Sequence, residues 1–573
     1  MSQRTRILLL IGLSAAGPLT AQTELQDVSG PWPGSALGSS VAAAGDVDAD
    51  GIPDWIVGSP KAPLGGLFGT PEVGEARVYS GRTGSLIHTF TGSQAYEHFG
   101  AAVAGAGDLN GDGYDDLLVG APDADHFIFP VEFNEAGKVA VYSGFNGSPL
   151  ATILGQSSGG RFGFSLAAGD VTGDGAPEIL VGAPRVTAGS FFELGVVYIY
   201  TYGESGIEFH LALDDWELAG HVLVHKGWSV AVVGDVSGNG RADVLVGAPH
   251  GSSDGAVLLY DGLDGSRLWY ELAGPNEKWL GFSVSAAGDY DGDGVLDFAY
   301  GAPGSGSTVP EDGVEGKAKV VSGSLPQMGG AYVPLAQMSG YSFHGQFGYS
   351  IAGGGDLDGD GLDDVVVGEP TDYFWESIYP GKAHVFSWEK GRTMVLTGVH
   401  PGSELGSSVA SLGSSLNSDG YHDFVVGAPG HGGPLWPKRG RAVLFSGSPT
   451  ESYGNGLGGS NVLTLSCDDN PYLAATLSFD LEGPTQASVG YLVLSYAKAI
   501  TTQLGGVVLV DTSNLYDTLP ASMAGGLGSV SVGLPWYPFL IGTDLYAQAW
   551  MLDSTQVAGW ALSNGVHLTL GSG

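Results

Sequence analysis

The 573-residue chain has a single cysteine, Cys467, and only 21 lysines and arginines against 61 aspartates and glutamates. One cysteine cannot form an intramolecular disulfide, so an exported chain of this kind depends on a large core or on bound metal for its stability. We interpret Cys467 as a buried, small apolar residue. The net charge of −40 repels phosphate backbones and anionic membranes, which excludes nucleic acid as a favoured partner.

The chain also lacks a run of about 20 apolar residues, so we expect no membrane span. The N-terminus instead has the pattern of a secretory signal. Arg4 and Arg6 precede the apolar run 7–13, and small residues lead to Ala21. The sequence therefore predicts a signal peptide over residues 1–21 and a chain that is secreted or held at the cell surface.

What is abundant is glycine, with 98 residues, in a chain that is still 43% hydrophobic. This combination predicts a packed, turn-rich protein and not a disordered one. A unit such as FGAAVAGAGDLNGDGYDDLLVGAP recurs seven times, about 60 residues apart. The copies begin at Leu37, Phe99, Phe162, Lys226, Leu280, Phe347 and Leu405.

Within each copy the apolar residues alternate or run for a few positions between glycines and aspartates, which is typical of strands. Four strands fit each repeat, and a repeat of this length with four antiparallel strands indicates a β-propeller blade. We therefore predict an all-β chain with a seven-bladed propeller over 22–449. The remainder, 450–573, has seven short strand-like runs and predicts a β-sandwich-like C-terminal domain.

The seventh copy ends after RAVLFSG and lacks its outer strand. The segment 23–30 stands before the first copy where an outer strand stands before the others. We expect this N-terminal segment to complete the seventh blade, which would remove an open sheet edge.

The first copy carries the pattern D-x-D-x-D-G-x-x-D. Calcium binds six to eight oxygen ligands, and carboxylates at alternate positions, one backbone carbonyl and a closing acid can supply them from a tight loop. Isolated aspartate and glycine clusters also form ordinary turns without metal. Repetition in one register favours metal, because several carboxylates within a few ångströms repel one another strongly.

The seven loops differ in their donors. Copies one, five and six offer four carboxylates each, copy two replaces one by asparagine, and copy three uses threonine and glutamate. We expect calcium in these five loops, and copy four, with two carboxylates, as a sixth candidate. The predicted ligands, with the carbonyl donor fourth in each set, are Asp46, Asp48, Asp50, Ile52 and Asp54; Asp108, Asn110, Asp112, Tyr114 and Asp116; Asp170, Thr172, Asp174, Ala176 and Glu178; Asp235, Ser237, Asn239, Arg241 and Asp243; Asp289, Asp291, Asp293, Val295 and Asp297; Asp356, Asp358, Asp360, Leu362 and Asp364. Copy seven, with Ser415, Asn417, Asp419 and Asp423, is the weakest candidate.

These motifs resemble the FG-GAP repeats of the integrin α-subunit propeller over roughly residues 23–447. The resemblance rests on Phe99-Gly100, Phe162-Gly163 and Phe347-Gly348, on Gly120-Ala121-Pro122 and its counterparts, and on the Asp loops. It implies calcium in hairpin loops on one face of the propeller and ligands or partner subunits on the other. Leucine replaces the phenylalanine in three copies and Lys226 in a fourth, so the resemblance implies the fold and not the integrin role.

Three classes of function fit the sequence. The long loops after each GAP tripeptide carry aromatic clusters, which favours an extracellular binding or adhesion module for a protein or glycan, with a monomeric propeller. These aromatics include His126, Phe127, Phe129 and Phe133; Phe191 and Phe192; Tyr373, Phe374, Trp375 and Tyr379; and Trp436. They could instead form small local cores beneath the loops.

The alternatives are a calcium-dependent hydrolase or lyase and a non-binding scaffold. Two G-x-S-x-G matches, at 155–159 and 251–255, are expected by chance in so glycine-rich a chain, and neither lies between a strand and a helix. His221 and His225 have a spacing that could serve a metal, but we favour surface or packing roles for both. No catalytic residue is therefore predicted.

Overall fold

The computed structural model describes residues 22–449 with internal gaps, and the backbone strands of the segment that follows. The longest gaps are 305–315, 325–333 and 371–379. The signal peptide predicted for residues 1–21 lies outside the described residues. Within the described residues, no helix has the length and apolar character needed to cross a bilayer.

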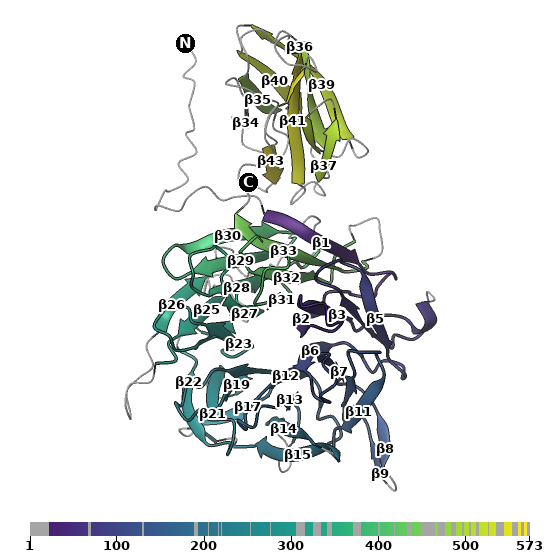
Figure 1. The fold of residues 1–573 in the computed structure, drawn as a ribbon, viewed down its shortest axis with the longest axis vertical. Helices are drawn as coiled ribbons and strands as arrows, with labels where there is room; N and C mark the ends of the chain where they lie inside the picture. The colour runs from purple at the N-terminus through teal and green to yellow at the C-terminus, as the bar shows by residue number, and fades with distance from the viewer. Residues whose placement is uncertain are drawn as a thin grey trace.

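Seven four-stranded antiparallel sheets are arranged around a common axis, as the four-strand repeat predicted (Figure 1). We number these blades in chain order, and each runs from an inner to an outer strand. The strands of blades 1 to 3 are β2 (Ser40–Gly45), β3 (Asp54–Ser59), β4 (Glu75–Tyr79) and β5 (Leu86–Thr91); β6 (Ala102–Gly107), β7 (Asp116–Ala121), β10 (Lys138–Tyr142) and β11 (Pro149–Leu154); β12 (Ser165–Gly169), β13 (Glu178–Ala183), β14 (Val196–Gly203) and β15 (Gly206–Leu213).

Blades 4 to 7 repeat the pattern. Their strands are β18 (Ser229–Val233), β19 (Asp243–Ala248), β21 (Ala256–Asp261) and β22 (Arg267–Leu272); β23 (Ser283–Gly288), β24 (Asp297–Ala302), β25 (Lys317–Val321) and β26 (Pro334–Ser339); β27 (Ile351–Gly355), β28 (Asp364–Glu369), β29 (Lys382–Ser387) and β30 (Gly391–Thr397); β31 (Ser408–Ser411), β32 (Asp423–Ala428), β33 (Arg441–Pro449) and β1 (Gln22–Ser29).

The last of these strands confirms the predicted closure. β1 pairs antiparallel with β33, with Val28 opposite Ala442 and Ser29 opposite Arg441. Arg441 also binds the carboxylates of Glu24 and Asp27. The N-terminal strand therefore forms the outer edge of the last blade.

The glycines of the repeat explain how neighbouring blades fit together. The N–H of Gly100 donates to the carbonyl of Gly120 in its own blade, and its φ of 84° suits only glycine well. A Cβ on Gly58 of blade 1 would lie 2.0 Å from the carbonyl oxygen of Gly100 in blade 2. A Cβ on Gly427 of blade 7 would likewise lie 2.1 Å from the carbonyl oxygen of Gly38 in blade 1. This close contact between the last and first blades closes the ring.

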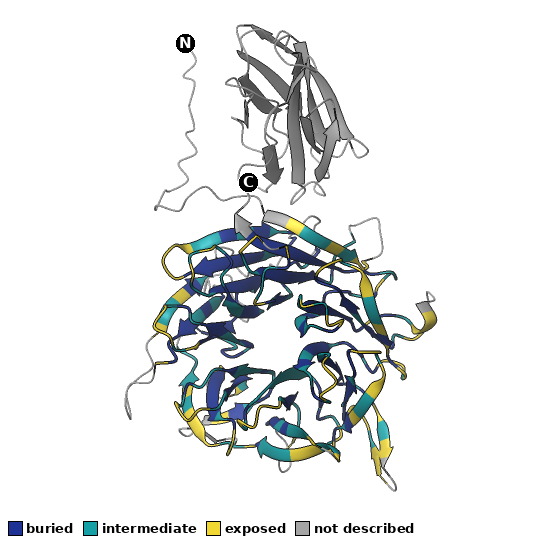
Figure 2. Cartoon of the chain, in the orientation of Figure 1, coloured by how far each residue is buried: buried dark blue, intermediate teal, exposed yellow. Residues whose placement is uncertain are grey.

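The core lies between the blades. Every residue of the second strand of each blade is buried, as in β3 and β7, because neighbouring sheets cover both of its faces (Figure 2). One core cluster, for example, joins Ile56 and Val78 of blade 1 to Val119 of blade 2. The outer strands are more exposed, which accounts for their alternating sequence.

In the described part of residues 22–449, three small features lie outside the blades. They are a one-turn 3₁₀ helix η1 (Leu64–Gly66), a hairpin of β8 (His126–Ile128) and β9 (Val131–Phe133), and a short sheet of β16 (Glu217–Leu218), β17 (His221–Val224) and β20 (His250–Gly251). All three come from segments that the repeat does not specify.

After residue 449 the backbone forms a further set of strands. They are β34 (Thr464–Cys467), β35 (Thr476–Glu482), β36 (Val489–Ser495), β37 (Lys498–Gln503), β38 (Gly506–Val510), β39 (Leu515–Ala524), β40 (Leu527–Gly533), β41 (Asp544–Leu552), β42 (Trp560–Leu562) and β43 (Val566–Thr569). Eight of them pair in one antiparallel sheet, and β37 pairs with β38. The sandwich-like packing predicted for this segment stays a prediction.

Candidate functional site: acidic loops on one face and aromatic rings on the other

The direction of the inner strands defines two faces of the propeller. Each inner strand begins just after the FG dipeptide and ends at an Asp loop, so these two motifs lie at opposite ends of every blade. We call the ends with the Asp loops the loop face and the ends with the FG dipeptides the rim face. The segments after the GAP tripeptides also emerge on the rim face, because the second strand runs antiparallel to the first.

Backbone N–H groups fold each Asp loop around its own side chains. In blade 1 the carboxylate of Asp46 accepts from the N–H groups of Asp50 and Gly51, both at 2.9 Å. Asp50 accepts from the N–H of Ile52, at 2.9 Å. Gly51, with a φ of 84°, permits the turn. The carboxylates at alternate positions are thereby held toward a common centre.

The closing acid of every loop is the first residue of the second strand, and all seven are buried. Asp54 accepts from the N–H groups of Val47 and Gly81, at 2.9 and 3.0 Å. Burial raises the pKa of Asp54 to about 7 and that of Asp364 to about 8. A buried carboxylate beside other carboxylates is costly unless a cation neutralises it.

Three loops bring three carboxylates within 4.8 Å of one another, and they belong to copies one, five and six. These are the copies in which the sequence offers four carboxylates. The groups are Asp46, Asp48 and Asp50; Asp289, Asp291 and Asp297; and Asp356, Asp358 and Asp360. Among the described residues, the other four loops form no group of three acids this close.

Those other loops nevertheless keep the same hydrogen bonds. The N–H groups of Tyr114, Ala176 and Arg241 donate to Asp112, Asp174 and Asn239. In copy seven, Tyr421 donates to Asp419 in the same way. The structure therefore places the predicted donor residues in equivalent turns, while their roles as ligands, including those of the carbonyl donors, stay predictions.

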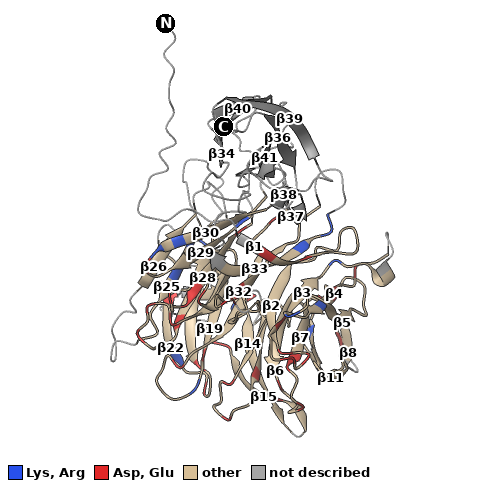
Figure 3. Cartoon of the chain, turned by 45° about the horizontal axis from the view of Figure 1, so that its top comes forward, with Lys and Arg blue, Asp and Glu red and all other residues tan. Residues whose placement is uncertain are grey.

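Among the described residues, two side-chain cations form ion pairs with carboxylates of the acidic loops. Lys390 places its Nζ 2.9 Å from Asp358 and 3.6 Å from Asp360. Arg82 places its Nε 2.6 Å from the Asp50 carboxylate. Lysine and arginine are scarce in the chain as a whole, with 21 residues against 61 aspartates and glutamates (Figure 3). The loop of blade 6 therefore has a built-in competitor for a metal ion.

Neighbouring loops are also linked to each other. The N–H of Asp46 donates to Asp115 of blade 2 at 2.7 Å, and the N–H of Asp289 donates to Asp363 of blade 6 at 2.8 Å. In the next pair of blades, His422 replaces the acid and accepts from the N–H of Asp356 through Nδ1, at 3.0 Å. In these three pairs of blades, the side chain before the closing acid therefore binds the loop of the preceding blade.

The rim face begins with one turn repeated in every blade. The residue after the FG dipeptide donates its N–H to the carbonyl of the residue before that dipeptide, as Trp228 does to His225 at 3.1 Å. In blades 3 to 6 the donor is an aromatic residue. These aromatics are Phe164, Trp228, Phe282 and Tyr349, and all are half-buried.

The four rings follow one another around the rim face. Their centroids are 4.7 Å apart from Phe164 to Trp228, 5.4 Å from Trp228 to Phe282, and 4.7 Å from Phe282 to Tyr349. Trp279 extends this arc beside Phe282, at 6.2 Å. Sequence reasoning singled out none of these residues, although their constant place after the FG dipeptide was a usable signal.

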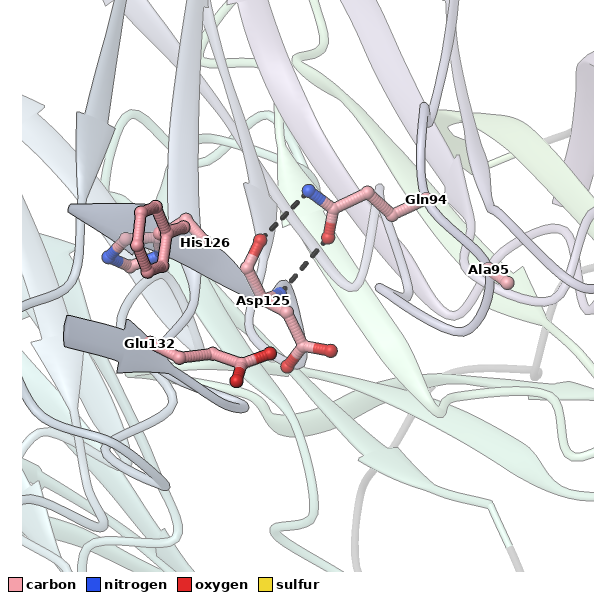
Figure 4. Close-up of a pocket in the computed structure, with 6 residues that line it drawn as sticks. Gln94, Ala95, Asp125, His126 and Glu132 are labelled. Carbon is pink, nitrogen blue, oxygen red and sulfur yellow. Dashed lines mark hydrogen bonds between the residues drawn. The ribbon is translucent and has the colours of Figure 1, made fainter. Parts of the chain in front are cut away.

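Of the aromatics that the sequence did single out, the described ones lie around the β8–β9 hairpin. Phe127 is 63% exposed, whereas the rings of His126 and Phe133 stack at 5.2 Å. Gln94 binds the backbone of Asp125 through both ends of its amide, at the edge of a shallow pocket (Figure 4). Phe129, Phe191, Phe192, Trp436 and the group 373–379 lie outside the described residues.

Charged pairs bridge neighbouring blades on the rim face. Asp123 binds both His98 of its own blade, at 2.6 Å, and Arg161 of blade 3, at 2.9 Å. Glu193 binds Arg185 of blade 3, at 2.6 Å, and His225 of blade 4, at 2.8 Å. The backbone of His225 has a φ of 61°, which turns the chain between β17 and the inner strand β18.

Comparison with known proteins agrees with these observations. The family model for the FG-GAP repeat matches residues 99–142, 162–200, 226–260, 280–320 and 347–386, which belong to blades 2 to 6. Integrin alpha-V of Gallus gallus is 30% identical over 256 residues, covering 41% of this chain and 23% of the relative. Integrin alpha-5 of Xenopus laevis is 31% identical over 234 residues, covering 40% and 21%. Integrin alpha-4 of Xenopus laevis is 31% identical over 281 residues, covering 47% and 25%. The matches therefore span a quarter or less of the length of these relatives.

Proposed function

Because this chain is an FG-GAP repeat protein with a seven-bladed propeller similar to those of integrin α chains, we propose that it is a secreted, calcium-binding extracellular module that binds a protein or glycan ligand. The observation that carries this proposal is the arc of aromatic rings on the rim face, opposite the acidic loops. The proposal assigns no catalytic residue.

Calcium has a structural role in this proposal. Copies one, two, three, five and six hold an ion each, and copy four is a sixth candidate. Hard oxygen donors on a tight loop suit calcium, and a divalent ion offsets the repulsion within each acidic group. The groups in blades 1, 5 and 6 provide the strongest support, because each holds three carboxylates within 4.8 Å.

The rim face is the ligand-binding surface in this proposal. Half-buried aromatic rings offer large contact areas with little loss of conformational entropy, and such residues dominate binding energies at interfaces. The neighbouring ion pairs of Asp123 and Glu193 add charged groups that can select the orientation of a ligand. A polar and aromatic rim of this kind suits a protein or a glycan.

The test is a glycan array and a cell-adhesion assay with the full chain in calcium. We expect Trp279→Ala and Phe282→Ala to weaken binding by more than about 1 kcal/mol, or roughly fivefold, without a matching loss of thermal stability. Phe145→Ala is the matched control, because this phenylalanine is 58% exposed and packs beside Tyr114 on the loop face. A ligand that binds all three variants equally would place its site elsewhere, and a chain with no ligand in either assay would contradict the proposal.

A further inference from the structure

Two histidines on the rim face direct the same ring atom toward each other. The Nδ1 atoms of His225 and His250 lie 3.1 Å apart, and both residues are half-buried. His225 precedes the inner strand of blade 4, and His250 follows the GAP tripeptide of the same blade. Both are therefore remote from the acidic loops, which lie at the other end of the blades.

The backbone around these histidines is fixed. Val224 of β17 pairs with His250 of β20, so the next residue, His225, is held beside His250. The N–H of His225 donates to the carbonyl of Glu193 at 3.0 Å. The ring of Trp228 packs against both imidazoles, with centroids 5.8 Å from His225 and 5.6 Å from His250. The pair is thus positioned before any ligand arrives.

Glu193 determines which nitrogen of His225 carries hydrogen. Its Oε2 lies 2.8 Å from Nε2 of His225, and its Oε1 accepts from Arg185 at 2.6 Å. The Glu193 carboxylate therefore accepts from Arg185 through one oxygen and faces His225 with the other. Because a carboxylate oxygen accepts, Nε2 of His225 is the N–H donor, which leaves Nδ1 to face His250.

The second ring, that of His250, is half-buried and directs its Nδ1 toward Nδ1 of His225. A neutral imidazole can present its own Nδ1 lone pair to the same point. A carboxylate that holds the far nitrogen of a histidine, as Glu193 holds that of His225, is the usual support of a metal-binding imidazole.

We propose that His225 and His250 are the two protein ligands of a site for a divalent transition-metal ion such as Zn²⁺. In tetrahedral coordination with Zn–N bonds of 2.0–2.1 Å, two nitrogens lie about 3.3 Å apart, close to the 3.1 Å between these atoms. Two nitrogen ligands favour such a metal over calcium, which prefers oxygen.

This inference goes beyond the proposed function, because it supplies a way to recognise a particular kind of ligand. Two protein ligands leave two tetrahedral positions for water or for a ligand group. A carboxylate or imidazole of a bound protein could replace the water. The metal would then attract an acidic ligand to a chain whose net charge of −40 otherwise repels it.

The test is a calorimetric titration of the full chain with zinc sulfate. The buffer contains about 5 mM calcium, so that the acidic loops are filled. We expect one equivalent of zinc to bind, and His225→Ala and His250→Ala each to weaken binding at least tenfold. Glu193→Gln should weaken it roughly tenfold, because it removes the group that orients His225. His98→Ala is the matched control, since this rim histidine binds Asp123 in blade 2 and should leave zinc affinity unchanged.

A second measurement separates ligation from folding defects. Cobalt(II) replaces zinc in such sites, and its visible absorption reports nitrogen ligands directly, so the wild-type spectrum should be lost in both alanine variants. The melting temperature of each variant without zinc verifies that it is folded. Equal zinc affinity in wild type and His250→Ala, or no binding up to about 1 mM zinc, would mean that the two rings share only a hydrogen bond, and the proposal would be wrong.

Discussion

At the scale of single residues, Lys226 shows how one repeat departs from the others. It occupies the position of the FG phenylalanine and is fully buried. Its Nζ binds the carboxylate of Asp215 at 2.7 Å and lies 5.6 Å from the ring centroid of Tyr260. Tyr260 and Arg267 bind the same carboxylate. One acid therefore neutralises a cation that replaces an apolar side chain.

Removing that acid should destabilise blade 4. We expect Asp215→Asn to cost about 3 kcal/mol of unfolding free energy, because it leaves the buried Lys226 charge uncompensated. The value is at the low end of the usual range, since the Asp215 side chain is itself 41% exposed. Chemical denaturation measures the loss, and Asp214→Asn, at the exposed neighbouring residue, is the matched control.

The pH dependence provides a further signature of this pair. Burial raises the pKa of Asp215, but the attraction and hydrogen bond of Lys226 outweigh it and hold the pKa below its ordinary value. The stabilisation is therefore complete above the unfolded pKa of about 3.9 and is lost as the pH falls through the folded value. The difference between wild type and Asp215→Asn should be constant from pH 7 to 5 and shrink below pH 4. A difference that persists in acid would point to packing as its cause.

Lys390 leads to a prediction about the loop of blade 6. Its ammonium contacts Asp358 and Asp360, where a metal ion would lie. Lys390→Ala should therefore lower stability in chelator but increase the gain that calcium produces. We expect this gain to rise by about 0.5–1 kcal/mol, because Lys390 is 50% exposed and its ion pairs are partly screened.

Calorimetric melting in chelator measures the stability without the ion, and melting in calcium measures the gain that the ion produces. Lys438→Ala provides the control, because Lys438 has a similar exposure but pairs with Glu404 on the rim face. If Lys390→Ala and Lys438→Ala respond alike to calcium, Lys390 does not compete with the ion.

The sequence predicted some of these residues and missed others for physical reasons. The Asp loops are local, since all donors of one loop lie within nine residues, and repetition made their ranking by carboxylate count possible. That ranking agrees with the three groups in blades 1, 5 and 6. The contact of His225 with His250, by contrast, joins two motif positions that are distant in sequence.

The contact between His225 and His250 could have been predicted from the repeat. The residue after each GAP tripeptide lies beside the turn before the FG dipeptide of its own blade, as the bonds Asp123 N–H to Glu97 O and Gly430 N–H to Ser403 O show. Aligning these two positions in blade 4 would have paired His225 with His250. The short spacing between His221 and His225 draws attention to that pair instead, and surface or packing roles are expected for both.

At the scale of elements, β1 binds more than its own blade. The side chain of Gln26 accepts from Nε1 of Trp55, at 2.9 Å, and donates to the carbonyls of Ser80 and Gly81 in blade 1. Leu25 and Val28 pack against the core cluster that joins blades 7 and 1. The N-terminal strand therefore connects the last blade to the first through side chains as well as through its backbone.

Substitution of Gln26 tests this connection directly. We expect Gln26→Ala to lower the free energy of unfolding by about 1–3 kcal/mol, because Trp55 is fully buried and its N–H would lose its partner. Ser29→Ala, on an exposed residue of the same strand, should change stability by less than about 0.5 kcal/mol. Denaturant midpoints compare the two, and equal midpoints would show that Gln26 does not support the junction.

The elements themselves were predictable wherever the repeat dictates them. The buried second strands gave continuous apolar runs, and the segment before the first repeat matched an outer strand. The short sheet of β16, β17 and β20 and the β8–β9 hairpin were not predicted, because each comes from a loop whose sequence occurs once. Strands of two to four residues leave too few positions to establish a period.

At the scale of the whole molecule, acidic charge and calcium are connected. If the acidic loops hold calcium, chelation should lower the melting temperature of the propeller. A site with a dissociation constant of about 10⁻⁴ M adds about 1.4 kcal/mol at 1 mM calcium, so five independent sites add about 7 kcal/mol. The two charged variants Asp291→Ala and Asp358→Ala should lose more of this calcium-dependent stability than Asn239→Ala.

Calorimetry in calcium and in chelator gives the comparison. Each of these three residues stands at an alternate position of its loop, so the variants differ mainly in the charge that they remove. Equal melting temperatures in both conditions would identify the loops as turns without a metal.

The pairing of β1 with β33 also sets an order of events during folding. Six blades are each completed by strands that are close in the chain, whereas the seventh joins residues more than 400 positions apart, as in the bond from Arg441 to Asp27. Closing so long a loop is entropically costly and is slow relative to local pairing. The blades can therefore assemble progressively as the chain emerges, with the first strand waiting unpaired until the last has been made. Ring closure is then the final, slow step, and the interval before it is when the open edge of blade 7 is most vulnerable to pairing with another chain.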